Sequence, residues 1–328
     1  MELFIDMMLL SMLAVTALAI AYLKDLFAVV MLAGIYGLLS ASLFATMDAV
    51  DVAFTEAAVG AGIFPLLMLV ALSITGRYER SRRVSWVALA LVSIVGILLI
   101  IGTVDMPPFG SPDAPAHTHV APRYIEQSGE EIGIPNIVTS VLASYRAFDT
   151  FGEVAVVFVA GVSVLALLGM APGDSRHGTD RSLNSMRQHK VLRVVSKILI
   201  PPIMLFALYV QFHGEYGPGG GFQAGVIFAA AIILYSILFG VGATKKAINQ
   251  GLVRFLAAFG LLLYGITGVL SLLTGENYLG YNGFAETATN AQHIGILVIE
   301  LGVGITVAAI MIVIFVTFSD RLNIQEKR

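Results

Sequence analysis

Three glutamates lie inside long apolar stretches of this sequence, namely Glu56, Glu153 and Glu300. A charged carboxylate in hydrocarbon costs at least about 2.5–3.5 kcal/mol, so an acid within a membrane span is by default a candidate functional residue. A carboxylic acid can take up a proton, and its ionised form can hold a cation. The three acids therefore predict either ion movement across a membrane or hydrogen bonds that hold helices together.

Glu56 follows two aspartates, Asp48 and Asp51, in the stretch DAVDVAFTEAAVGAG. If a helix begins near Asp51, a rise of about 1.5 Å per residue places Glu56 about 7 Å inside it. Either aspartate could instead be the N-cap of that helix, with Glu56 favoured by the helix dipole in an early turn. We predict that Glu56 takes part in ion movement and that the two aspartates flank its entrance.

Glu153 shares a helix face with Arg146 and Asp149, because the three residues are spaced i, i+3 and i+7. Arg146 can pair with Asp149 and leave Glu153 as the titrating group, or it can pair with both acids. A nearby arginine lowers the pKa of a carboxyl group, whereas desolvation raises it. The cluster is therefore either part of an ion path or a structural ion-pair group at the membrane interface.

Glu300 is the deepest of the three acids, about nine residues and 14 Å into the last apolar stretch. His293 precedes it by seven residues and lies on the same helix face. A carboxylate with an imidazole above it suits a proton relay. The alternative is a single hydrogen bond from a neutral Glu300 to a neighbouring helix.

The stretch QFHGEYGPGGGFQAG (211–225) resembles a phosphate-binding loop, but it lacks the Lys–Ser/Thr pair and opens an apolar helix. It predicts a tight external turn, in which His213 and Glu215 are polar groups at the outer surface. Gly221 and Gly225 form a face of small residues that needs a partner helix, either within the chain or from another protein of a complex.

The composition of the chain indicates which class of protein carries these acids. The chain has 328 residues, of which 57% are hydrophobic and only 12% are charged, and its net charge is −3. A soluble domain carries about twice that charged fraction. The net charge argues against a nucleic-acid partner. The absence of cysteine excludes disulfides, thiolate metal sites and iron–sulfur clusters on this chain. No cofactor is expected.

The fold expected is an all-α, polytopic membrane helix bundle. The N-terminal stretch has no basic region and reads as a first span rather than a signal peptide. Apolar runs long enough to cross a bilayer number about nine. They cover residues 2–22, 26–46, 52–74, 84–102, 149–170, 192–212, 222–243, 253–274 and 291–317.

Alternate loops carry most of the arginine and lysine, for example Arg77, Lys190 and Lys245. With nine spans, the positive-inside rule then places the N-terminus outside and the C-terminus in the cytoplasm. Polar stretches divide the chain into a three-helix unit (1–76), a two-helix unit (77–172), a cytoplasmic linker (173–190) and a four-helix unit (191–328). Within the second unit we expect an irregular external loop over 103–135 and an interfacial helix over 136–149.

Three motifs occur in a fixed order. They are DLFAVVMLAGIYGLLSASLFATMDAVDVAFTEAAVG, NIVTSVLASYRAFDTFGEVAVV and HGEYGPGGGFQAG. Together they resemble membrane subunits of Mrp-type multisubunit cation/proton antiporters and related membrane-bound hydrogenases. The order resembles a fusion of the end of the family's large A-type component with its B-type component. Glu215 stands where the B-type motif usually has a histidine, and Ala224 where it usually has a glycine.

This resemblance implies a prokaryotic plasma-membrane complex in which partner subunits complete the exchange of protons for Na⁺ or another monovalent cation. It matches Glu56 and Glu153 to motif positions, so these two are the expected transport carboxylates, with transient Na⁺ binding. We expect an ion transporter subunit rather than an enzyme. One alternative is a membrane subunit of an energy-converting hydrogenase or other redox-driven pump. Another is a scaffold whose acids only secure helix contacts.

Overall fold

The computed structural model describes residues 2–79, 85–108, 110–169 and 189–325. Within these ranges the chain forms helices, and nine of its helical segments are long and apolar enough to cross a membrane, which confirms the predicted all-α fold and its spans. They are α1 (Glu2–Tyr22), α2 (Leu26–Thr46), the third span made of α3 (Val50–Glu56), η1 (Ala57–Ile63) and α4 (Phe64–Thr75), α5 (Trp86–Thr103), α9 (Ala147–Leu168), α11 (Lys190–His213), α12 (Gly221–Phe239), α14 (Gln250–Leu273) and α15 (Ala288–Gln325).

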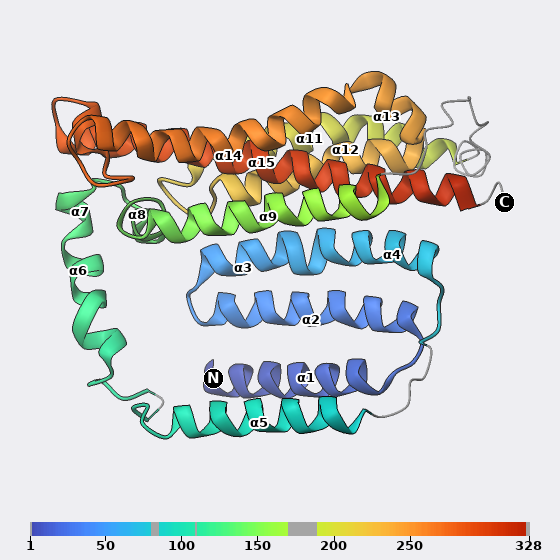
Figure 1. Cartoon of the computed structure of the whole chain (residues 1–328), viewed down its shortest axis with the longest axis horizontal. Coiled ribbons are helices and arrows are strands. Elements are labelled where there is room, and N and C mark those ends of the chain that lie inside the picture. Colours follow the sequence, from blue (N-terminus) through green and yellow to red (C-terminus); the bar gives the residue numbers. More distant parts are fainter. Residues whose placement is uncertain (1, 80–84, 109, 170–188, 326–328) are drawn as a thin grey trace.

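The spans run roughly parallel, so the described loops gather at two ends (Figure 1). We call the end with Asp48 and Gly214 the loop end, and the end with Arg77, Lys190 and Lys245 the basic end. The linker expected over 173–190 lies almost entirely outside the described residues. The orientation of the two ends relative to the cytoplasm stays a prediction from the positive-inside rule.

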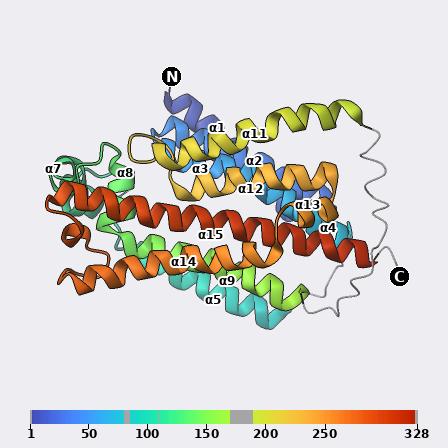
Figure 2. The same cartoon turned by 90° about the horizontal axis from the view of Figure 1, so that it is seen from above.

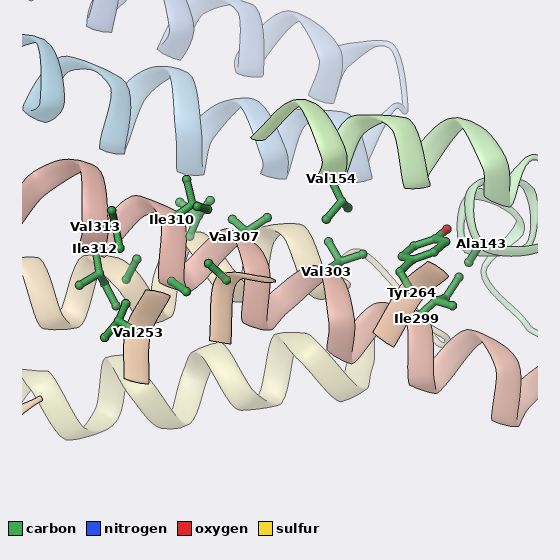
Figure 3. Packing of buried hydrophobic residues seen from close by; sticks show 14 of the residues in the cluster. Ala143, Val154, Val253, Tyr264, Ile299, Val303, Val307, Ile310, Ile312 and Val313 are labelled. Carbon is green, nitrogen blue, oxygen red and sulfur yellow. The ribbon is translucent and has the colours of Figure 1, made fainter. Parts of the chain in front are cut away.

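Helix α15 is the centre of the bundle. It packs against α9, α11, α12, α14 and α4. Val303, Val307 and Ile310 on α15 are buried, and Val154 of α9 and Tyr264 of α14 point toward them (Figure 3). Of the nine described spans, α15 has the largest share of buried residues, as expected for the helix that the others surround.

Small residues set the closest crossings. A Cβ atom added to Gly225 of α12 would lie 2.7 Å from the carbonyl oxygen of Gly304 on α15. The partner of the predicted small-residue face on α12 is therefore α15 of the same chain. A Cβ added to Gly37 of α2 would lie 2.6 Å from the carbonyl carbon of Gly60, so α2 packs equally closely on the third span. Such approaches are typical of helix contacts within membranes.

The third span changes its winding directly after Glu56. Residues Ala57–Ile63 form a π-helical segment, η1, and the α-helix resumes at Phe64. π-Helical insertions often occur at functional sites, because they re-aim the neighbouring side chains. Figure 1 shows the three pieces as one continuous rod beside α2.

The loop-end segment that we expected to be irregular over 103–135 contains short helices. These are η2 (Ala116–Val120), α6 (Ala121–Glu126) and α7 (Ser128–Glu131). Further along, the expected interfacial helix over 136–149 is divided into α8 (Ile137–Ser140) and η3 (Val141–Tyr145), and α9 begins at Ala147. The break falls at Arg146, whose φ of −124° and ψ of 32° are not helical.

Two short helices complete the last unit. Helix α13 (Val241–Ala247) links α12 to α14 at the basic end, and the 3₁₀ turn η4 (Tyr281–Phe284) precedes α15 at the loop end. Tyr281 is fully buried and donates a hydrogen bond to the carbonyl oxygen of Ala143 at 2.8 Å. The four-helix unit is thereby joined to the segment before α9.

Candidate functional site

The turn between α11 and α12 collects polar groups from three distant parts of the chain. Asn136 donates from Nδ2 to the carbonyl oxygens of Gly214 and Gly217, at 3.1 Å each. Thr139 donates to the Gly214 carbonyl at 2.6 Å. These bonds pin the turn against α8. Gly220 ends the turn with a φ of +116°, which favours glycine.

Glu300 of α15 reaches the start of α12, where its Oε2 accepts a hydrogen bond from the backbone N–H of Gly221. The first N–H groups of a helix are free and the helix dipole is positive there, so this position favours a carboxylate. A Cβ atom at Gly221 would lie 2.9 Å from Glu300 Oε2 and would also overlap the Glu300 backbone. Glycine at 221 is therefore required for this contact.

Glu215 and His293 form a hydrogen bond beside this contact, with Glu215 Oε2 2.8 Å from His293 Nδ1. The other oxygen of Glu215, Oε1, is buried and has no hydrogen-bond partner among the described residues. We expected His293 to stand directly above Glu300 on one helix face. In the structure its ring contacts Glu215, and Glu300 contacts α12.

A small cavity separates the two acids. Its volume is about 30 Å³, and Glu215, Glu300, Thr139 and Gln211 contribute to its walls. A space of this size that several polar groups reach can hold a water molecule. We call Glu215, His293, Glu300 and this cavity the Glu215–Glu300 site.

Asp51 and Glu56 lie on the α3 side of the same turn. Asp51 Oδ1 accepts from Asn136 Nδ2 and from the Gly219 amide, both at 3.3 Å. The residue before Glu56, Thr55, accepts a hydrogen bond from Gln223 of α12 at 2.8 Å. Glu56 itself is half-buried, and its carboxylate lies against Gly60 in the middle of the π-helical segment.

The N-cap alternative for Asp48 or Asp51 is wrong, because Ala49 precedes the first turn of α3 and no side chain caps it. Asp48 is exposed and has a φ of 58°. His213 stacks on Tyr209 with ring centroids 4.8 Å apart and is not among the residues that line the cavity. Neither Asp48 nor His213 belongs to the Glu215–Glu300 site.

Glu153 lies apart from this site. Arg146 and Asp149 form an ion pair at 2.6 Å, with more than half of the Arg146 side chain and half of the Asp149 side chain exposed. Glu153 is also exposed, whereas the next residue, Val154, is completely buried against α15. Figure 3 shows Val154 pointing toward α15. Glu153 therefore presents its carboxylate on the outer surface of this chain.

The sequence analysis missed several neutral polar residues that build the site. Their shared feature is an amide or hydroxyl group at the loop end of a helix, and they are Asn136, Thr139, Gln211, Gln223 and Gln292. Gln292 accepts from Ser144 at 2.7 Å and donates to Asn282 at 3.0 Å. An amide inside an apolar stretch was the signal that could have found Gln211 and Gln223.

Among the described residues, no three His, Cys, Asp or Glu side chains gather in a way that could hold a metal ion. Transient binding of Na⁺ at Glu56 or Glu153 stays a prediction.

Three families of known proteins match successive parts of the chain. Residues 11–77 match the MbhD family, and residues 81–176 match the MbhE family, which are the D and E components of MBH. Residues 191–313 match the domain related to the MnhB subunit of the Na⁺/H⁺ antiporter.

Two curated relatives cover different lengths. The chain is 28% identical over 218 residues to a probable K⁺/H⁺ antiporter A/B subunit of Rhizobium meliloti, a match that covers 61% of this chain and 21% of that relative. It is 30% identical over 132 residues to the putative antiporter subunit mnhB2 of Staphylococcus aureus strain MRSA252, covering 39% of this chain and 93% of the relative. The chain thus spans about a fifth of the length of the first relative.

Two solved structures are similar. One belongs to the Mrp complex from Dietzia sp. DQ12-45-1b, with a TM-score of 0.73, 24% identity, and coverage of 95% of this chain and 34% of the other. At that identity the likeness shows the fold alone. The other belongs to the membrane-bound sulfane sulfur reductase, an archaeal respiratory membrane complex, with a TM-score of 0.54, 30% identity, and coverage of 71% and 97%.

Proposed function

Because the chain belongs to the family of Mrp-type antiporter subunits of the A/B kind, which is related to the MBH subunits, we propose that it is a membrane subunit of a monovalent cation/proton antiporter. The 30% identity along 93% of the Staphylococcus aureus subunit supports this proposal. The chain would act in the plasma membrane of a prokaryote with further antiporter subunits, since its relatives are named as subunits of antiporters. The successive family matches support a unit boundary near residue 80 and another between 176 and 191.

The Glu215–Glu300 site is the part of this chain that we assign to proton handling. The observation that carries the assignment is the bond from the Gly221 amide to Glu300 inside the bundle. The amide and the helix dipole favour ionised Glu300, whereas the surrounding apolar helices favour the neutral acid. A group under two such opposed influences can take up and release a proton in turn.

The proton would reach Glu300 through the pair at the loop end. His293 Nδ1 and Glu215 Oε2 lie 2.8 Å apart, within reach of a proton transfer, and water in the cavity would connect Glu215 to Glu300. Glu56 lies on the third span, which also contacts α12, and keeps its predicted part in cation or proton movement. Glu153 would act only where another protein of the complex covers the exposed face of α9.

Replacement of Glu300 by glutamine tests the assignment. Glu300→Gln keeps the size of the side chain but removes its titration, so cation/proton exchange should fall by on the order of 100-fold. Exchange is measured in everted vesicles that contain the whole complex, and assembly is checked by co-purification of the other subunits. Exposed Glu286, at the same end of the chain, provides the control Glu286→Gln, which should retain exchange. Full exchange by assembled Glu300→Gln would remove Glu300 from the mechanism.

The same assay tests the two carboxylates that match the family motifs. We expect Glu56→Gln and Glu153→Gln each to abolish exchange in complexes that still assemble. Normal exchange in either variant would exclude that residue. If the variants instead lose their partner subunits, the scaffold alternative gains support.

A subunit of a redox-driven ion pump is the second candidate function, and the 30% identity to the sulfane sulfur reductase structure favours it. The subunits that co-purify with this chain separate the two candidates. Iron in the purified complex would indicate the redox pump, because a chain without cysteine cannot hold an iron–sulfur cluster by thiolates.

A further inference from the structure

An apolar groove opens between α11, α12 and α15, and Val253 and Leu256 of α14 also line it. Its volume is about 570 Å³, and its walls include Met204, Ala207, Phe228, Tyr235, Ala308 and Ile312. This volume lies within the range of about 300–1,000 Å³ that is usual for small-molecule sites. Nothing in the proton-handling proposal uses this groove.

Two prolines lie within α11, between the groove residues Ile200 and Met204. Pro201 and Pro202 provide no backbone N–H, so the carbonyl groups of Lys197 and Ile198 lose their usual helical donors. Prolines inside a helix are the commonest cause of a bend. Figure 2 shows the first half of α11 diverging from α12 toward the basic end. The divergence widens the space between these two helices.

Two cations mark the basic end of the groove. Arg193 and Lys197 precede groove residue Met204 by eleven and seven positions, which places all three on one face of α11. The Arg193 guanidinium lies 5.2 Å and the Lys197 ammonium 5.6 Å from the centre of the Phe239 ring. Phe239 in turn packs on groove residue Tyr235, with ring centroids 4.8 Å apart. The charges therefore stand where the groove ends.

Neither cation has an acidic partner in the described part of the chain. Arg193 Nε is buried there without a hydrogen-bond partner, and no ion pair between described residues includes Arg193 or Lys197. Lys245 at the same end differs, because it pairs with Asp320 at 2.6 Å. The two cations of α11 thus leave a local positive charge next to the apolar groove.

We propose that the groove between α11, α12 and α15 binds one anionic phospholipid, with an acyl chain among the apolar walls and the phosphate at Arg193 and Lys197. Arginine matches phosphate with two parallel N–H donors, and basic pockets between membrane helices on the cytoplasmic side favour anionic headgroups. The positive-inside rule assigns the basic end to that leaflet. A free phosphate ion would bind the two cations but leave the apolar groove unfilled.

Photolabelling of the intact complex in nanodiscs tests the proposal. The probe is phosphatidylglycerol with a photoreactive group on one acyl chain, and the comparison is the same acyl chain on phosphatidylcholine. We expect phosphatidylglycerol to label groove residues such as Met204 and Phe228 at least several-fold more than phosphatidylcholine does. Equal labelling by the two headgroups, or a crosslink from these residues to another protein of the complex instead of lipid, would overturn the proposal.

Variants separate the headgroup from the acyl chain. Arg193→Gln with Lys197→Gln should remove the preference for phosphatidylglycerol, whereas Lys246→Gln, an exposed cation at the same end, should keep it. Ala308→Phe fills the groove and should lower labelling by both probes. An unchanged preference in the double variant would count against the proposal, and the headgroup comparison on the natural chain decides the matter if a variant does not assemble.

Discussion

At the scale of single residues, the structure changes which of the three acids is the strongest candidate for a functional residue. The sequence supported Glu300 by its depth alone. In the structure Glu300 accepts a hydrogen bond from the Gly221 amide and lines the small cavity that Glu215 also lines. Glu153, which matches a family motif, is exposed on α9. The reason is that depth along a helix does not say which face of the helix a neighbour covers.

A second residue-scale cluster makes a pH-dependent contact outside the spans. Glu131 accepts hydrogen bonds from the Tyr145 hydroxyl and from Arg123, and these hold the pKa of Glu131 below its usual value. Burial, together with the bond to Glu131, raises the pKa of Tyr145 to about 12, so its hydroxyl stays a donor at neutral pH. The contact ties α6 and α7 to η3.

We predict that this contact weakens in acid. A carboxyl group with a lowered folded pKa stabilises the folded state above its unfolded pKa of about 4.3, and that stabilisation is lost as the pH falls through the folded value. Amide hydrogen exchange over residues 121–131, corrected for its intrinsic pH dependence, should be protected at pH 6 and lose protection below about pH 4. Glu131→Gln should lose protection at pH 6, whereas Glu130→Gln should not. Equal protection in both variants would contradict the role of Glu131.

At the scale of elements, glycines decide how closely α15 approaches its neighbours. A Cβ at Gly225 would press on the Gly304 carbonyl at 2.7 Å and on Val307 at 3.0 Å. Backbone atoms cannot rotate away as a flexible side chain can. The crossing of α12 and α15, and with it the contact between Gly221 and Glu300, therefore depends on the absence of a side chain at 225.

We predict that Gly225→Ala destabilises the protein by about 1–3 kcal/mol, the usual cost of an overpacked core. The matched control is Gly96→Ala on α5, where an added Cβ meets no atom within 4 Å. Alanine there should be neutral or stabilising by about 0.5–1 kcal/mol, because it favours the helix. Thermal unfolding of the purified complex measures both changes. A melting temperature for Gly225→Ala at or above that of the unsubstituted complex would show that the crossing can widen.

At the scale of the whole molecule, contacts between units link what the sequence separates. Asn136 of the second unit holds the Gly214 turn of the last unit, and α9 packs along α15. Helix α5 is the exception, because none of its residues is buried, and in Figure 1 it lies beyond α1, at the edge of the molecule opposite α15.

These contacts predict that the chain still assembles when it is divided. Residues 1–172 and 191–328, expressed together as two polypeptides, should assemble, because α9 and α15 meet without a covalent link. Co-purification through an affinity tag on one piece measures the assembly. Division within the last unit, between Gly240 and Val241, is the control and should reduce assembly, because it cuts the close connection of α12 to α13. Failure of the first pair to associate would mean that the covalent link is essential.

The sequence by itself determined the membrane spans, because the hydrophobic effect acts on each apolar run separately and a bilayer fixes its length. It also determined that a small-residue face would need a partner, and which acids lie deep along the chain. Only the tertiary structure decided that Glu215 pairs with His293, that Glu300 reaches the Gly221 amide, and that Glu153 faces outward. Those outcomes depend on helix rotation and on contacts between residues more than seventy positions apart, which no local pattern contains.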